Sequence, residues 1–304
     1  MSTPTITTLN GEPPLFQPRR LAFWVFCLFV IGGVHTTWQT LHTGFEVMPL
    51  SAVAGVVGWG LYILPLLWIF RRLGIFRNHS AQALFMAFLW GGLGAVYLAL
   101  SANQAMFGIL AKTLGPEFLQ TWGPGIVGPT DEEPLKLLGV VLLVLIAPQR
   151  FRSVSTVMAL GFLVGLGFQV VENYFYTVEG AMNHPNANQW EPVTQLLLVR
   201  GLLCGLWSHA AYTAIASFGV GYFVSHRDAS LSKRLFVAVA AFAVAWSMHA
   251  FWNSPLLSSI LKGDFVILYF PAKGIPVVLA ALLLWREARR ESADPVDSLD
   301  IPRP

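Results

Sequence analysis

The sequence predicts an all-α protein whose helices form a polytopic transmembrane bundle. Of its 304 residues, 55% are apolar and 12% are charged, and its mean hydropathy is +0.60, whereas about a quarter of the residues in an average soluble domain are charged. The apolar residues fall into blocks of about 20, the length that a helix needs to cross a hydrocarbon core of ~30 Å. Helices are the expected spanning elements, because a chain in lipid must satisfy its backbone hydrogen bonds internally.

About eight apolar blocks follow one another along the chain. The predicted spans are residues 21–40, 51–70, 81–102, 130–147, 153–178, 193–224, 235–254 and 264–285. Pro271 and Pro276 predict a kink or a break in the last of them. The polar residues 1–20 are expected to form a disordered cytoplasmic tail rather than a cleaved signal peptide. The acidic residues 286–304 are expected to form a second solvated, disordered cytoplasmic tail.

The distribution of basic residues predicts the orientation, because cytoplasmic loops are enriched in Lys and Arg. With both termini inside, most of the nineteen basic residues fall in cytoplasmic segments and only Lys112 and Lys262 lie on the opposite side. We therefore expect a multi-pass protein, N-in and C-in, in a lipid bilayer such as the bacterial inner membrane. The basic residues form short runs between apolar blocks rather than a patch, so the pattern indicates no nucleic-acid partner.

Ionisable groups inside membrane spans are costly and are functional candidates by default, and five of those in the predicted spans stand out. They are Glu132 and Glu133 on the fourth span, Glu172 on the fifth, His209 on the sixth and His249 on the seventh. Counted from the cytoplasmic ends of their spans, they lie at depths of roughly 21 to 27 Å. The sequence therefore predicts that these groups share one level in the outer third of the bilayer.

On three of these spans the ionisable residue belongs to a row of residues spaced by three or four positions, many of them small. The rows are Gly161, Gly165, Phe168 and Glu172; Gly201, Gly205, His209, Thr213 and Ser217; and Ala238, Ala241, Ala245, His249 and Asn253. Small residues allow neighbouring helices to approach closely. We therefore expect the ionisable groups to face the bundle interior.

Residues 130–134 (TDEEP) look like a helix N-terminus with acidic residues in its first turn. Capping is therefore an open alternative for Asp131. For Glu132 and Glu133 a functional role is favoured, because Lys136 lies four and three residues further on and can keep one carboxylate ionised.

Carboxylates and imidazoles at one level provide general acids, general bases and metal ligands. No serine or cysteine is paired with the cluster, so activated water is the expected nucleophile. A proton- or ion-coupled transporter could use the same groups as a relay, but such proteins often have repeated halves, which are not evident here. A catalytically inactive scaffold is a third alternative.

Four short motifs occur in order on consecutive predicted helices between residues 130 and 254. They are Glu132-Glu133-x-x-Lys136, Phe168-x-x-x-Glu172-Asn173, His209 and His249-x-x-x-Asn253. In these motifs the chain resembles the PrsW family of intramembrane proteases and, more distantly, the CAAX-prenyl endopeptidase and bacteriocin-processing group. The resemblance implies an intramembrane endopeptidase that cleaves a membrane-anchored protein near the extracytoplasmic face, with an anti-sigma-factor-like substrate as in some relatives.

The resemblance also implies roles for individual residues. Glu132 or Glu133 would activate water, Glu172 and His209 would complete the catalytic set, and His249 and Asn253 would polarise the carbonyl and hold the oxyanion. The supporting residues would be Lys136, Phe168, Asn173 and Arg200.

Both a glutamate-type and a metal-dependent mechanism stay open. No His-Glu-x-x-His helix is present, and no cofactor is certain. Zinc, if bound, would be held by Glu172, His209 and His249.

Three further polar residues have competing interpretations. Arg200 is either an interfacial anchor or a clamp on the acidic cluster. Lys273 is a candidate counter-ion to a glutamate. Asn103 is expected to be a helix cap.

Overall fold

The structure of the chain, a computed structural model, describes residues 14–76, 79–186, 188–257, 261 and 268–293. Within these ranges every regular element is helical. The α-helices are α1 (Leu21–Val47), α2 (Pro49–Arg72), α3 (Ala81–Leu89), α4 (Val96–Leu114), α5 (Pro116–Ile146), α6 (Val154–Met182), α7 (Trp190–Leu196), α8 (His209–Ser225), α9 (Leu231–Asn253) and α10 (Tyr269–Ala293). A π-helical turn, Trp90–Ala95, joins α3 to α4, and a second one, Leu197–Leu203, follows α7.

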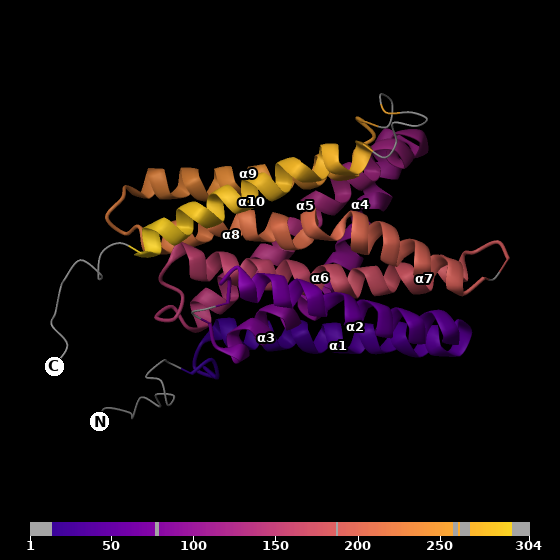
Figure 1. Cartoon of the computed structure of the whole chain (residues 1–304), viewed down its shortest axis with the longest axis horizontal. Helices are drawn as coiled ribbons and strands as arrows, with labels where there is room; N and C mark the ends of the chain where they lie inside the picture. The colour runs from indigo at the N-terminus through magenta and orange to yellow at the C-terminus, as the bar shows by residue number, and fades with distance from the viewer. Residues whose placement is uncertain (1–13, 77–78, 187, 258–260, 262–267, 294–304) are drawn as a thin grey trace.

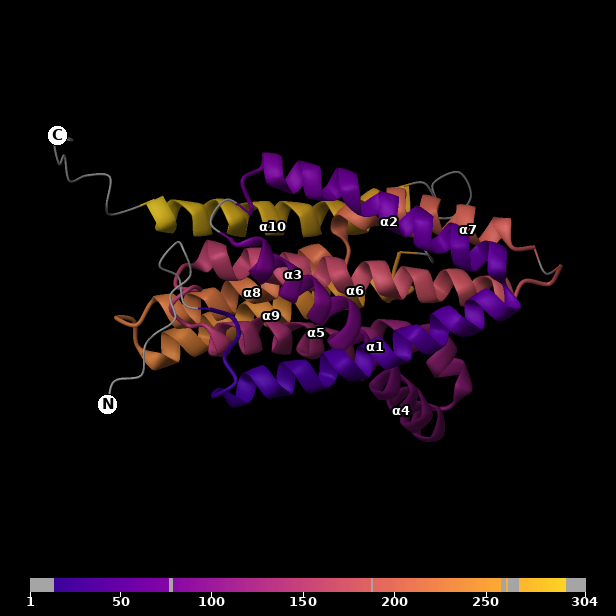
Figure 2. The same ribbon diagram turned by 90° about the horizontal axis from the view of Figure 1, so that it is seen from below.

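Helix α6 forms the centre of the bundle, with α2, α3, α5 and α8 packed around it (Figures 1 and 2). In its most apolar 18-residue window, 94% of the residues are buried, against 17% in α1, α2, α9 and α10. The outer helices instead expose apolar side chains such as Leu28, Leu61 and Phe236. A surface of this kind is stable in lipid, whereas in water so large an apolar area would drive association.

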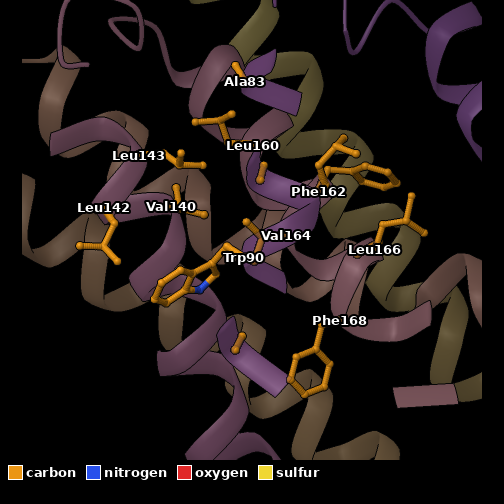
Figure 3. Packing of buried hydrophobic residues seen from close by; sticks show 14 of the residues in the cluster. Ala83, Trp90, Val140, Leu142, Leu143, Leu160, Phe162, Val164, Leu166 and Phe168 are labelled. Carbon is orange, nitrogen blue, oxygen red and sulfur yellow. The ribbon is translucent and has the colours of Figure 1, made fainter. Parts of the chain in front are cut away.

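The core between α3, α5 and α6 is built around Trp90 at the start of the first π-helical turn. Figure 3 shows its indole beside Val140 and Val164, and its Nε1 donates a 3.0 Å hydrogen bond to the backbone oxygen of Leu135. The buried ring thus packs against α5 and satisfies its one polar group there, as a buried tryptophan must. This contact fixes α5, which carries Glu132, Glu133 and Lys136, against α6.

Six helical segments are long and apolar enough to cross a membrane. They are residues 21–47, 49–72, 81–114, 154–182, 231–253 and 269–291. The predicted all-helical, multi-pass architecture is therefore confirmed. The count of eight spans and the N-in, C-in orientation remain predictions.

Basic residues gather at one end of the bundle, where α2 and α10 finish and α6 begins (Figure 1). We call it the basic end; it carries Arg20, Arg72, Arg150, Arg227 and Arg290. The α1–α2 turn and the α6–α7 connection lie at the opposite end.

Helix α5 begins much earlier than the sequence predicts. It starts at Pro116 and passes through Pro124, Pro129 and Pro134, so residues 130–134 lie inside a helix and the predicted N-terminus there is wrong. Asp131 therefore lies inside a helix and does not cap its N-terminus, so the capping interpretation is wrong. Asn103 is likewise no cap, because α4 continues past it to Leu114.

The predicted sixth span, residues 193–224, is not one helix. Helix α7 passes into the second π-helical turn, a 3₁₀ turn follows at Gly205–Trp207, and α8 starts only at His209. The predicted row from Gly201 to Ser217 is therefore interrupted. Irregular backbone at membrane depth is tolerated where it is packed in protein or lines a cavity, and here the break presents His209 at a helix N-terminus.

The two predicted tails are partly ordered. Leu15 is fully buried and Arg20 donates a 2.8 Å hydrogen bond to the backbone oxygen of Leu145, so residues 14–20 pack on the bundle. Helix α10 continues through Pro276 to Ala293, so no break occurs there and residues 286–293 are helical. Residues 1–13, 264–267 and 294–304 lie outside the described residues.

Candidate active site

Four helices bring polar side chains into one buried cluster beside a pocket of about 310 Å³. Helix α5 contributes Glu132, Glu133 and Lys136, α6 contributes Glu172, α8 begins with His209, and α9 contributes His249 and Asn253. Glu132, Glu133, Lys136, His209 and His249 are at most 5% exposed. Such burial is costly unless each charge is paired, and the pairing determines what each group can do.

Close packing of α6 on α8 places His209. A Cβ on Gly165 would lie 2.2 Å from the backbone oxygen of His209 and 2.6 Å from the Cα of Ala210. Only glycine therefore allows α8 to begin at this distance from α6.

A first chain of contacts links Lys136, Glu133 and His249. The Nζ atom of Lys136 donates to Oε1 of Glu133 at 2.6 Å, and the same oxygen lies 2.8 Å from Nδ1 of His249. A carboxylate can only accept, so Nδ1 of His249 carries the proton. Its Nε2 therefore presents a lone pair, to which Nδ2 of Asn253 donates at 3.2 Å.

A second chain links Arg200, Glu172 and His209. Arg200 donates to Oε2 of Glu172, which lies 3.1 Å from Nε2 of His209. The carboxylate therefore fixes the proton on Nε2, and Nδ1 of His209 accepts a 2.8 Å hydrogen bond from Lys136. Arg200 also donates to Oδ1 of Asn173 at 2.5 Å and lies over the ring of Tyr176. Of the two readings of Arg200, its contacts match the clamp on the acidic cluster.

Glu132 lies between the two imidazoles. Its Oε2 is 3.6 Å from Nδ1 of His209, 3.9 Å from Nε2 of His249 and 3.6 Å from Nζ of Lys136. This oxygen is buried and has no hydrogen-bond partner among the described residues. Glu132 lines the pocket, whereas Glu133 does not and is fully buried. Of the two adjacent glutamates, only Glu132 offers a free oxygen to the pocket.

The cluster fits a divalent metal ion. One ligand atom each from Glu132, His209 and His249 lies within 4.8 Å of the others, and two imidazoles with one carboxylate form a common catalytic zinc set. The opposite nitrogen of each histidine is bound to a carboxylate, as is usual for metal-ligating histidines. Lys136 would have to release Nδ1 of His209 for that atom to bind a metal. Glu172, expected among the ligands, is instead paired with Arg200.

Two pocket residues were not recognised from the sequence. Tyr212 stacks on His249 with ring centroids 4.9 Å apart, and its buried hydroxyl has no partner among the described residues. Asn103 directs Nδ2 towards Oε1 of Glu132 at 3.5 Å, and its Oδ1 is unpaired within the same part of the chain. Tyr212 could have been found from its position three residues after His209 on one helix face.

Phe168 and Lys273, two residues singled out in the sequence, contact other residues of the site or its border. Phe168 lies under Lys136, whose Nζ is 4.6 Å from the ring centre. Lys273 pairs with no glutamate among the described residues: its Nζ donates to the backbone oxygens of Trp252 and Ser254, at 2.8 and 2.7 Å, and to the hydroxyl of Tyr269. It therefore caps the end of α9 beside Asn253.

Comparison with known protein families matches residues 79–285 to the PrsW family intramembrane metalloprotease. This range covers more than half of the chain and includes every helix of the cluster. No curated protein and no solved structure matches the chain. With its apolar spans and this match, the chain is a multi-pass membrane protein that belongs to the PrsW family of intramembrane proteases.

Proposed function

We propose that the chain hydrolyses a peptide bond of a membrane-anchored protein near the extracytoplasmic face, with Glu132 as the base that activates water. The observation that carries this proposal is the unpaired, buried Oε2 of Glu132, which faces the pocket between His209 and His249. A general base must present a free lone pair within reach of the attacking water. Glu133 is less suited, because it does not line the pocket and its Oε1 is bound by both Lys136 and His249.

The proposed reaction is a water addition followed by cleavage of the C–N bond. Glu132 takes a proton as the water oxygen bonds to the carbonyl carbon, and the carbonyl oxygen becomes an oxyanion. Glu132 then passes this proton to the amide nitrogen, the C–N bond breaks, and a carboxylic acid and an amine form, between which the remaining proton of the water moves to give a carboxylate and an ammonium group. The two chains of contacts hold both imidazoles in fixed tautomers throughout.

Two groups are placed to donate to the oxyanion. The hydroxyl of Tyr212 is buried in the pocket lining with no competing partner among the described residues. Nδ2 of Asn253 also lies at the pocket, where it would have to exchange its hydrogen bonds to Nε2 of His249 and to the backbone oxygen of Pro124 for one to the oxyanion. Preorganised donors of this kind stabilise the developing charge more than water can. His249 is less suited to this donation, because its Nδ1–H is directed at Glu133.

Two asparagines are suited to binding the backbone of the substrate. Oδ1 of Asn103 and Nδ2 of Asn173 are buried, line the pocket, and have no hydrogen-bond partner among the described residues. Together they offer one acceptor and one donor, the pair that an extended peptide group needs. They would bind the peptide independently of its side chains.

If the metal of the family is bound, Glu132, His209 and His249 would hold it, and Glu132 would then be a ligand in place of the base. Such an ion would supply a water of lowered pKa and a Lewis acid for the carbonyl oxygen.

The distribution of basic residues supports a reaction near the extracytoplasmic surface. The basic end faces the cytoplasm by the charge rule for membrane loops. Glu132 lies fourteen residues from the last residue of α5, Ile146, which puts it about 21 Å from that end. The pocket then lies in the outer part of the bilayer.

The test is Glu132→Gln in the full chain, co-expressed with a single-span protein as substrate. We expect cleavage to fall by about 10² to 10⁴-fold, the usual contribution of a general base, with unchanged abundance. Glu117→Gln is the matched control, because Glu117 lies on the same helix and is exposed. Full activity of Glu132→Gln would overturn the assignment.

A further inference from the structure

A second cavity of about 410 Å³ opens at the basic end, between α2 and α10. Its floor is formed by Met158 and Phe162 of α6 and by Ala211 and Ala214 of α8. It shares no lining residue with the active-site pocket, and apart from its mouth its lining is apolar. We call this cavity the α2–α10 groove.

The dimensions of the groove match one acyl chain. Along α10 its lining extends from Val278 to Arg289, a separation of eleven positions or about 16 Å of helix. This length is about half of a ~30 Å hydrocarbon core, the depth of one leaflet. A transmembrane helix of ~10 Å diameter spans both leaflets and would not fit into this volume.

The mouth of the groove is positively charged. Arg286 and Arg289 line it, and both are exposed. The nearest acidic residues of α10 are engaged elsewhere, since Glu287 pairs with Arg290 and Glu291 lies 3.7 Å from His226. Within the described residues neither arginine of the mouth has a carboxylate partner. Arginine binds phosphate oxygens well, through charge and paired N–H donors.

We propose that the α2–α10 groove binds an anionic phospholipid, with one acyl chain in the apolar cavity and the phosphate on Arg286 and Arg289. Basic pockets between helices on one side of a membrane are suited to such headgroups. The site does not depend on the proposed proteolytic function, since it uses none of the active-site residues.

The test measures lipids retained by the purified full chain, by native mass spectrometry after exposure to equal amounts of phosphatidylglycerol and phosphatidylcholine with identical acyl chains. We expect wild type to retain one phosphatidylglycerol. Arg286→Gln/Arg289→Gln should weaken this binding about 30-fold, because each arginine near an anionic membrane surface contributes about fivefold to the affinity and the variant removes two of them. Arg227→Gln/Arg290→Gln removes the same net charge from exposed positions outside the groove and should retain the lipid.

A second variant tests the acyl site without changing charge. Ala281→Phe places a ring in the groove and should abolish retention, whereas Leu283→Phe, at a 66% exposed position on the same helix, should not. Equal retention of both lipids by wild type, or equal loss in the arginine double variant and its control, would overturn the proposal.

Discussion

Lys136 and His209 meet through a 2.8 Å hydrogen bond between Nζ and Nδ1, although 73 positions separate them in the chain. The same ammonium group bonds Glu133 and lies 3.6 Å from Glu132. The ammonium group of Lys136 therefore links the two glutamates of α5 to the imidazole at the start of α8.

Replacing Lys136 by methionine should destabilise the protein strongly. The variant keeps most of the side-chain volume but leaves Glu133 buried beside His249 with no cation, and an unpaired buried charge costs about 3–5 kcal/mol. Thermal unfolding in detergent measures the change. Lys112→Met removes the same charge from an exposed position on α4 and should change stability by less than ~0.5 kcal/mol. Equal stability of the two variants would contradict the structural role of Lys136.

Removing the hydroxyl of Tyr212 should reduce turnover without reducing stability. The hydroxyl has no partner among the described residues, so Tyr212→Phe breaks no hydrogen bond of the resting protein. If it donates to the oxyanion, kcat should fall by about 10² to 10³-fold. Tyr222→Phe, on the same helix but outside the pocket lining, is the control. Unchanged kcat in Tyr212→Phe would leave Asn253 as the oxyanion donor.

Arg200 should act by positioning Glu172 and His209. Arg200→Gln removes the cation that holds the Glu172 carboxylate in its position against Nε2 of His209. We expect kcat to fall about 10 to 100-fold, the usual effect of removing an outer partner of a catalytic or metal-bound histidine.

Arg200→Lys should restore part of this activity, because it keeps the charge but loses the donor to Asn173. A merely interfacial anchor would give full activity in both variants.

Metal analysis distinguishes the two catalytic classes. If a metal is used, purified chain should contain one zinc per molecule, and chelation should remove zinc and activity together. Glu132→Gln and His209→Ala should lose the ion, whereas Glu172→Gln should keep it with an affinity about 10 to 100-fold lower. Stoichiometric zinc in Glu132→Gln would contradict the ligand set Glu132, His209 and His249. Activity that survives chelation in metal-free protein would assign water activation to Glu132 without a metal.

The helical class and the membrane setting could be predicted from the sequence because they depend on composition and on the length of apolar blocks. The ionisable residues could be picked out for the same reason, since charges at membrane depth are rare and each of them lies inside a predicted span. Residue spacing cannot show where a helix stops when prolines and glycines occur inside it. Helix α5 therefore begins at Pro116 instead of Thr130, and the chain breaks before His209 instead of continuing from Val193.

What the sequence by itself determined is the set of side chains available for chemistry, Glu132, Glu133, Glu172, His209 and His249, together with their membrane surroundings. Only the tertiary structure decided how they are paired. In the structure Glu133 is paired with Lys136 and His249, and Glu172 is paired with Arg200 and His209. One oxygen of the pocket residue Glu132 has no hydrogen-bond partner among the described residues. Pairing depends on contacts between helices that are distant in sequence, and a shift of one helix by a few ångströms would exchange the partners while leaving every periodicity unchanged.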